Sequence, residues 1–539
     1  MPCCKCKDYG WEASEPVVFT DSSGKGYCEF HSPLENKTIN GNEFNTQVFL
    51  KIQKDKESGH CKLTGIVYPK DITFFEIGEI PELPSLDLSS SVFHGDADFS
   101  KCRFSGDVEI WSAKFKNKLY FKDATVFGGL TISDVEIDDS MEFSRSKFVG
   151  MVSLSMISVG SSLVFYYSNL NSQFFIKDVA VKGDVSFVQS KFEDHVAISG
   201  FHVSGKYNCF EAEFLKDFML TDVVVMNLFE FFKLKQRNNS ENATILKEAN
   251  FKRATFHGNV YINSAVFRDN VYFVSTLFMS SVRFTSVRFF SNVQFDDAVI
   301  KQNLWIYNEK MTTFPERGCV SFKNLAIGGE ARISHTVLAN FSFFGYDISR
   351  FKFDDCVWRT DKNGNFCIFG AEDGEAIDDL KKYESVYRTL KKRAIDNHDE
   401  LMASAWHYQE KSIATKLLSE KQCKNLQDKL LWIFLCLYKK CSGYGEDPVK
   451  GIVVLMQLVG MIVIFVFGSY IYNVGMQSYE ISWSGICSIF ETSLKLTLFM
   501  DAGIKRIDIF SAGALIFSRV LLPIQAALFA LSLRNKLRR

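Results

Sequence analysis

Residues 97–126 read ADFSKCRFSGDVEIWSAKFKNKLYFKDATV. Large apolar side chains recur in this stretch at alternating steps of five and six residues. The positions on this period continue without a slip to residue 203: Phe99, Phe104, Ile110, Phe115, Phe121, Val126, Ile132, Ile137, Phe143, Phe148, Leu154, Val159, Phe165, Leu170, Ile176, Val181, Phe187, Phe192, Ile198 and Val203. The period resumes at 214–231, restarts at 251–306 and ends in a weaker run at 322–358.

Most of these positions have an apolar or small partner two residues earlier, as Ala97 precedes Phe99. Spacing by two places side chains on one face of a strand and excludes a helical supercoil with an 11-residue repeat. Each unit of five or six residues can form one side of a coil, so four units make a rung of about 22 residues. The sequence predicts a four-sided β-helix over 79–360, with a polar insert at 233–247.

These units resemble pentapeptide repeats, in the variant that alternates five- and six-residue units. The resemblance implies a right-handed quadrilateral β-helix of about ten or eleven stacked rungs with a continuous apolar interior. Most of the 52 phenylalanines in the 539-residue chain then belong to this interior. They are not expected to form a cofactor site or a nucleic-acid stacking platform, because they point inward.

Cysteines cluster at the N-terminus, and their spacing is typical of zinc ligands. A Cys-x-x-Cys pair with a Cys-x-x-His pair is a plausible tetrahedral structural zinc set. The predicted ligands are Cys3, Cys6, Cys28 and His31, with Cys4 as the alternate to Cys3. Because residues 1–78 have few apolar side chains for a core of their own, a metal would supply folding energy. The segment 27–37 also resembles a zinc-binding cap that precedes some bacterial pentapeptide-repeat arrays.

The apolar spacing becomes helical after Trp358. Residues 370–445 are predicted to form a cytoplasmic helical linker, and 387–411 resemble a helical hairpin of membrane-bound members of this family. The nine apolar residues 430–438 are too few to span a bilayer, so we expect them at its surface.

Residues 449–539 are predicted to form a transmembrane domain with two spans, 452–472 and 509–533. Both segments are apolar and long enough to cross the hydrocarbon core of a bilayer. Basic residues flank the outer end of each span, which places both termini in the cytoplasm. The expected location is therefore the bacterial inner membrane, with a multi-pass topology.

Between the spans, 483–500 is predicted to form a re-entrant, pore-loop-like helix. Glu491 and Lys495 are spaced to pair on one face of this helix, and Asp501 follows it. The segment and the second span resemble the ion-channel-like domain attached to some bacterial pentapeptide-repeat proteins. A Thr-Val-Gly-Tyr-Gly filter is missing from the sequence, so the resemblance does not imply potassium selectivity.

Arg519 lies about ten residues inside the second span, where a charge needs a partner or water. Glu491 and Asp501 are the candidate partners, and the residue would then line or lock a pore. The alternative is a structural residue near the outer interface whose side chain extends to water.

The composition excludes several classes of function. The 62 Lys and Arg balance the 63 Asp and Glu, so nucleic-acid binding is not expected. No catalytic motif is found, so we expect no enzyme and no catalytic residues.

We expect a solenoid that senses an unknown protein partner and controls a homo-oligomeric channel-like domain, in stress or phage defence. The alternatives are a membrane-anchored interaction scaffold without conductance and, least favoured, a gyrase-binding DNA mimic.

Overall fold

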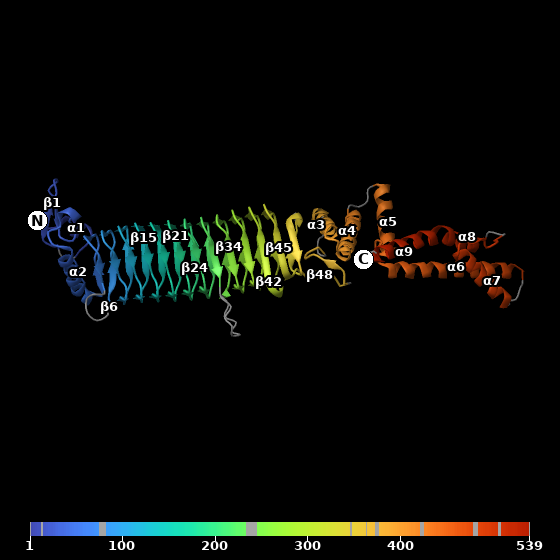
Figure 1. The fold of residues 1–539 in the computed structure, drawn as a ribbon, viewed down its shortest axis with the longest axis horizontal. Helices are drawn as coiled ribbons and strands as arrows, with labels where there is room; N and C mark the ends of the chain where they lie inside the picture. The colour runs from blue at the N-terminus through green and yellow to red at the C-terminus, as the bar shows by residue number, and fades with distance from the viewer. Residues whose placement is uncertain are drawn as a thin grey trace. The chain divides into compact units, whose positions relative to one another are not determined.

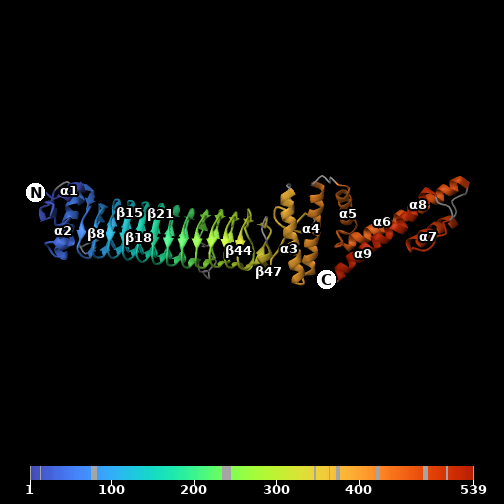
Figure 2. The same cartoon turned by 90° about the horizontal axis from the view of Figure 1, so that it is seen from above.

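The computed structural model (Figures 1 and 2) divides into two compact units, Met1–Arg359 and Thr360–Arg539. The structure describes residues 2–11, 14–74, 82–232, 245–344, 348–362, 364–371, 377–420, 425–477, 483–504 and 508–537.

The first unit is a parallel β-solenoid of about 12 turns, which confirms the predicted fold class. Four stacks of short strands form its sides, and in most turns a strand pairs with the strand 22 residues further along. One side contains β10 (Arg103–Phe104) and β14 (Thr125–Val126), and the next contains β11 (Val108–Trp111) and β15 (Leu130–Ile137). The remaining two sides contain β12 (Lys114–Phe115) with the second half of β15, and β13 (Leu119–Tyr120) with β16 (Met141–Glu142).

The apolar period of the sequence forms the interior of the solenoid. All twenty positions from Phe99 to Val203 are buried. Phenyl rings of successive turns stack, with centroids 5.4 Å apart between Phe121 and Phe143 and 4.5 Å apart between Phe143 and Phe165. The prediction that these phenylalanines point inward is therefore confirmed.

A second 11-residue ladder, which the sequence analysis did not identify, lies between the apolar positions. Its residues have positive φ between 51° and 62°: Ser90, Lys101, Ser112, Asp123, Asp134, Arg145, Met156, Tyr167, Asp178 and Gln189. This left-handed conformation costs a residue with a Cβ roughly 1–2 kcal/mol. Two such residues per turn of the solenoid bend the chain. Stacking of the turns stabilises these bends and offsets the conformational cost.

The solenoid continues across the predicted insert. Strand β30 (Phe229–Phe232) pairs with β34 (Val260–Asn263), although 27 residues including the insert separate them in sequence. Of the insert 233–247, residues 233–244 lie outside the described part of the chain. Ile245–Leu246 form β31, which already pairs with β35 (Val266–Phe267).

The amino-terminal end of the solenoid is covered by helix α2 (Gly41–Asp55). Asn40 caps this helix by accepting hydrogen bonds from the backbone N–H groups of Asn42 and Glu43. Its buried residue Phe44 packs against Tyr68 of the first turn, with ring centroids 6.0 Å apart. The apolar column is thereby closed from solvent at this end.

The second unit begins with a helical hairpin, α3 (Ile377–Asp396) and α4 (Glu400–Glu420), followed by α5 (Leu426–Ser442). Tyr387 of α3 and Trp406 of α4 are buried against each other, with ring centroids 5.8 Å apart. In contrast, α5 leaves a group of large apolar side chains exposed: Leu430, Leu431, Ile433, Phe434 and Leu437.

Two apolar segments follow, and each is long enough to cross a membrane. The first is α6 (Pro448–Gln477). The second consists of α8 (Ile509–Ile516), a π-helical turn at Phe517–Leu521 and α9 (Leu522–Leu537). The shorter helix α7 (Trp483–Thr497) lies between them in sequence and contacts α6.

The two apolar segments pack in antiparallel directions. Phe465 contacts Phe517 with ring centroids 5.2 Å apart, and Gly451 lies against Phe529. Polar side chains, three of them small serines, recur every seven residues on the second segment and are buried: Ser511, Ser518, Gln525 and Ser532. Small residues allow close helix packing where the surroundings are apolar.

Candidate functional site

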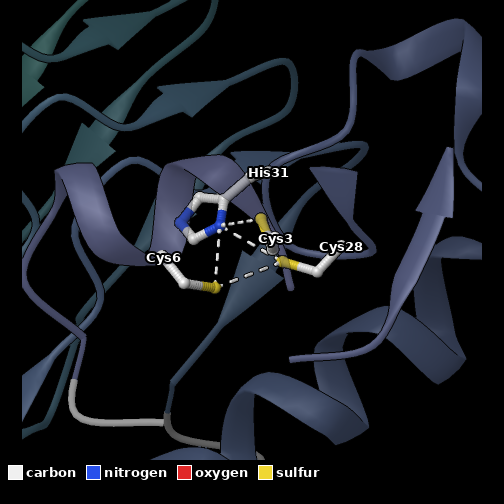
Figure 3. Close-up of side chains that lie close together, drawn as sticks. All are labelled: Cys3, Cys6, Cys28 and His31. Atoms are coloured by element: carbon white, nitrogen blue, oxygen red, sulfur yellow. Dashed lines mark hydrogen bonds between the residues drawn. The ribbon is translucent and has the colours of Figure 1, made fainter. Parts of the chain in front are cut away.

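Four potential metal ligands converge in the amino-terminal region (Figure 3). These residues are Cys3, Cys6, Cys28 and His31, and their ligand atoms lie within 4.8 Å of one another. His31 Nδ1 lies 3.1 Å from Cys28 Sγ and 3.6 Å from both Cys3 Sγ and Cys6 Sγ, while the Cys6 and Cys28 sulfurs are 3.8 Å apart. A tetrahedral Zn²⁺ with bonds of about 2.3 Å to sulfur and about 2.0 Å to nitrogen requires separations of roughly 3.5–3.8 Å. Three of the four separations lie in this range and that between Cys28 and His31 is shorter, so the cluster could hold such an ion.

Two short elements position the ligands. Cys3 is the N-cap of α1 (Cys4–Asp8), and Cys6 lies three residues later on the same face. Cys28 ends β2 (Gly26–Cys28), and its carbonyl accepts hydrogen bonds from the backbone N–H groups of His31 and Ser32. This tight turn directs the Cys28 and His31 side chains to the same point. Cys4 is only partly buried and lies outside the cluster.

A carbonyl of the solenoid orients the His31 ring. His31 Nε2 lies 3.2 Å from the Thr64 carbonyl oxygen, so a proton on Nε2 donates there and leaves the Nδ1 lone pair facing the three sulfurs. Trp11 Nε1 donates to the Thr64 hydroxyl oxygen at 3.0 Å. Such outer-shell contacts fix the tautomer and the direction of a metal-binding histidine.

The burial of the cluster disfavours the free thiolates. It raises the pKa of the Cys28 thiol well above its usual value, and it lowers the pKa of His31 to about 4. Without an ion, burial therefore favours a protonated Cys28 thiol and a neutral imidazole, whereas at Cys3 burial is outweighed by hydrogen bonds from backbone N–H groups, which lower the pKa of its thiol. A bound cation would replace the thiol protons, so metal binding and proton release are coupled.

Lys37 fixes the peptide between two of the ligands. Its ammonium donates to the carbonyl oxygens of Glu29 and Phe30 and lies 4.4 Å from the centroid of the Phe44 ring. Burial lowers its pKa to about 8, although the Glu29 carboxylate opposes this shift. Lys37 and Phe44 thus link the candidate metal centre to the helix that covers the solenoid.

The second group of predicted site residues lies on and after α7. Glu491 and Lys495 form an ion pair with 2.5 Å between Oε1 and Nζ, at the predicted spacing. The Asp501 carboxylate accepts a hydrogen bond from the Gly503 backbone N–H at 3.0 Å. Arg519 lies in the π-helical turn and is exposed. Among the described residues, Arg519 forms no ion pair with Glu491 or Asp501.

An ion cluster around a buried carboxylate of the hairpin was not predicted from the sequence. Glu410 of α4 is buried and pairs with Lys391 and Arg388 of α3. Burial raises the pKa of Glu410, but these two cations more than offset that effect and hold it below its usual value. Glu410 lies 22 and 19 residues from Arg388 and Lys391 in sequence, so no local motif identifies the cluster.

A polar network joins the hairpin to the apolar helices. Ser404 of α4 donates to the Glu446 carboxylate, and Thr415 of α4 hydrogen-bonds the Tyr444 hydroxyl at 2.7 Å. From the other side, Gln525 Nε2 of α9 donates to the carbonyl oxygens of Cys441 and Gly451, each at 2.9 Å. The α5–α6 turn is therefore held by the hairpin and by the second apolar segment.

Comparison with known proteins gives one match. Residues 241–288 match the family model for pentapeptide repeats (9 copies). No curated protein and no solved structure is significantly similar to the chain. The match and the parallel β-solenoid together support a pentapeptide-repeat protein.

Proposed function

We propose that this pentapeptide-repeat protein is anchored in the inner membrane, with both termini in the cytoplasm, and that its solenoid controls an oligomeric channel-like domain formed by α6–α9. The observation that carries the proposal is the exposure of the two long apolar segments. Only 17% and 22% of their most apolar windows are buried. The core helix of a soluble domain would be mostly buried, so a lipid environment accounts for these surfaces better.

The contacts of the α5–α6 turn support control by the cytoplasmic side. A displacement of α4 would act on Glu446 and Tyr444, and through the turn on Gln525 of α9. The exposed apolar face of α5 fits a helix lying at the membrane surface, next to the cytoplasmic end of α6. We further propose that a protein partner bound to the solenoid causes this displacement, whereas catalysis and nucleic-acid binding have no part in the proposal.

We also propose that the amino-terminal cluster holds a structural Zn²⁺. Three sulfurs and one imidazole form a closed set of four ligands, which is typical of structural rather than catalytic zinc. A bound ion would stabilise the segment that covers the first turn of the solenoid. Elemental analysis of the purified protein should give about one equivalent of zinc, and less than half an equivalent would contradict this part of the proposal.

Ion flux across liposomes tests the channel. The full-length protein should increase flux over empty liposomes and over liposomes containing the heat-denatured protein. Retention in the bilayer without flux would favour the alternative, a membrane-anchored scaffold. For the biological role, we propose membrane depolarisation in stress or phage defence, which a voltage-sensitive dye would detect after induction of the protein.

A further inference from the structure

Two polar side chains are exposed on the apolar helices. Gln457 of α6 and Arg519 of the π-helical turn are both exposed in the single chain. Within the part of the chain that the structure describes, neither side chain has a hydrogen-bond or ion-pair partner. A guanidinium or carboxamide facing hydrocarbon is costly, so each needs a partner that one chain does not provide.

The antiparallel packing places these two residues at a similar depth. Phe465 of α6 packs on Phe517, and Gly451 packs on Phe529. Counted from these contacts, Arg519 lies within about one helical turn of the level of Gly460, and Gln457 precedes Gly460 by three residues. The donor and the acceptor are therefore within about two helical turns of each other along the axis of the helical pair, and both are exposed rather than bonded to each other.

Gly460 leaves room for a neighbouring helix at this level. A Cβ built on Gly460 would meet no atom within 4 Å, unlike one on Gly451 or Gly468 of the same helix, which face α9 and α8. Gln457 and Gly460 are three residues apart and share a face with Ile464, whose side chain is 62% exposed. This face can accept another helix at short distance.

A π-helical turn at Arg519 is a second, independent observation. The wider turn runs from Phe517 to Leu521 and interrupts the regular helix at this residue. Such turns are rare and occur frequently at functional sites, because they displace a side chain relative to the regular helix.

We propose that Arg519 of one copy of this chain donates hydrogen bonds to the Gln457 side-chain oxygen of the next copy, across Gly460. Arg519 and Gln457 lie on different helices, so the contact is heterologous, and its repetition around an axis closes a ring. The proposal rests on the proposed function because it requires both helices to be in a bilayer. The proposed contact assigns Arg519 to the interface between subunits.

Crosslinking between differently tagged copies tests the interface. Cys423, Cys436, Cys441 and Cys487 are first changed to Ser in the full-length chain. One tagged form then receives Gln457→Cys and the other Arg519→Cys, and a short bis-maleimide is applied to membranes containing both. We expect a product with both tags. The matched control is Val463→Cys, also exposed on α6 but about 120° around the helix, which should give little product with Arg519→Cys.

Variants give a second readout. Gln457→Leu and Arg519→Leu should each raise the dissociation constant of the oligomer about tenfold in detergent, and the double variant should be no weaker than either single variant. A strictly monomeric wild type, equal crosslinking of Val463→Cys, or unchanged association of both variants would overturn the interface. These outcomes would indicate that Arg519 extends to water or lipid headgroups instead.

Extraction separates failure of the interface from failure of the proposed function. Wild type and variants should all remain in membranes washed with alkaline carbonate. Release of the wild type would contradict the proposed membrane anchor, whereas retention without crosslinking would contradict the interface alone.

Discussion

Single residues account for both the candidate metal centre and the bends of the solenoid. Cys3, Cys6, Cys28 and His31 follow from their spacing, and the sequence analysis identified all four. The hydrogen-bonding partner of His31, Thr64, could not be identified, because it lies on the first solenoid turn, 33 residues away. The left-handed ladder was also missed, since its members share no chemistry: serine, lysine, aspartate, arginine and methionine all occur there.

The first prediction concerns the metal ligands. Cys28→Ser should abolish zinc binding and lower the melting temperature, because it removes one of four ligands from a buried site. Zinc content and thermal unfolding measure the two effects. Cys4→Ser is the matched control and should change neither, since Cys4 lies outside the cluster; equal loss of zinc in both variants would contradict the assignment.

The second prediction compares how glycine substitutions at two positions of the solenoid change the free energy of unfolding. Met156 is 57% exposed and has a φ of 51°, so Met156→Gly should relieve up to about 1 kcal/mol of backbone strain. Met219 is exposed in β28 (Phe218–Thr221), and Met219→Gly should instead destabilise by about 0.5–1 kcal/mol. Denaturant unfolding of the two variants gives the comparison. Destabilisation of the same size by both would argue against strain at the corner.

Elements are stabilised by contacts that repeat in the solenoid and by specific contacts in the hairpin. The apolar period could be recognised in the sequence because each turn repeats the same strands. Because the turns stack, this one period predicts the interior of the whole solenoid. The packing of the helical unit was not predictable, because α3, α4 and the α5–α6 turn meet through single side chains without a repeat.

The third prediction concerns one phenyl ring of the stack. Phe143 is fully buried between Phe121 and Phe165, so Phe143→Ala should destabilise by about 3–5 kcal/mol through lost burial and a cavity. Phe127 is 41% exposed, and Phe127→Ala should cost less than about 1 kcal/mol. Unfolding free energies of the two variants test this prediction. Similar losses of stability would indicate that the buried rings do not dominate the stability of the core.

The fourth prediction is a pH dependence of the hairpin. The pKa of Glu410 is lower in the folded protein than in the unfolded chain, so its ion pairs stabilise the hairpin above the unfolded value, about 4.3. That contribution should be lost as the pH falls through the lowered folded pKa. Glu410→Gln should be less stable at neutral pH and should lose stability less steeply in acid. Circular dichroism of the unfolding transition between neutral pH and strong acid measures both, and identical acid profiles would exclude this role for Glu410.

At the scale of the whole molecule, the chain combines a solenoid that has a candidate metal centre near its amino-terminal end with a pair of long apolar helices. The sequence predicted the two apolar segments from length and hydropathy, which are local properties. The spacing of Glu491 and Lys495 predicted their ion pair, but it could not predict that Arg519 stays exposed, because that depends on how α7 packs against the segments. The proposed interface between copies follows from this difference.

The most direct test of the central claim, that α6 and α8–α9 cross a bilayer, is the labelling of introduced cysteines by a membrane-impermeant maleimide in intact cells. In a Cys487→Ser background, Asp501→Cys should be labelled from outside. Lys440→Cys, which precedes α6, should be labelled only after permeabilisation. Equal labelling of both positions, or a chain recovered in the soluble fraction, would contradict the account.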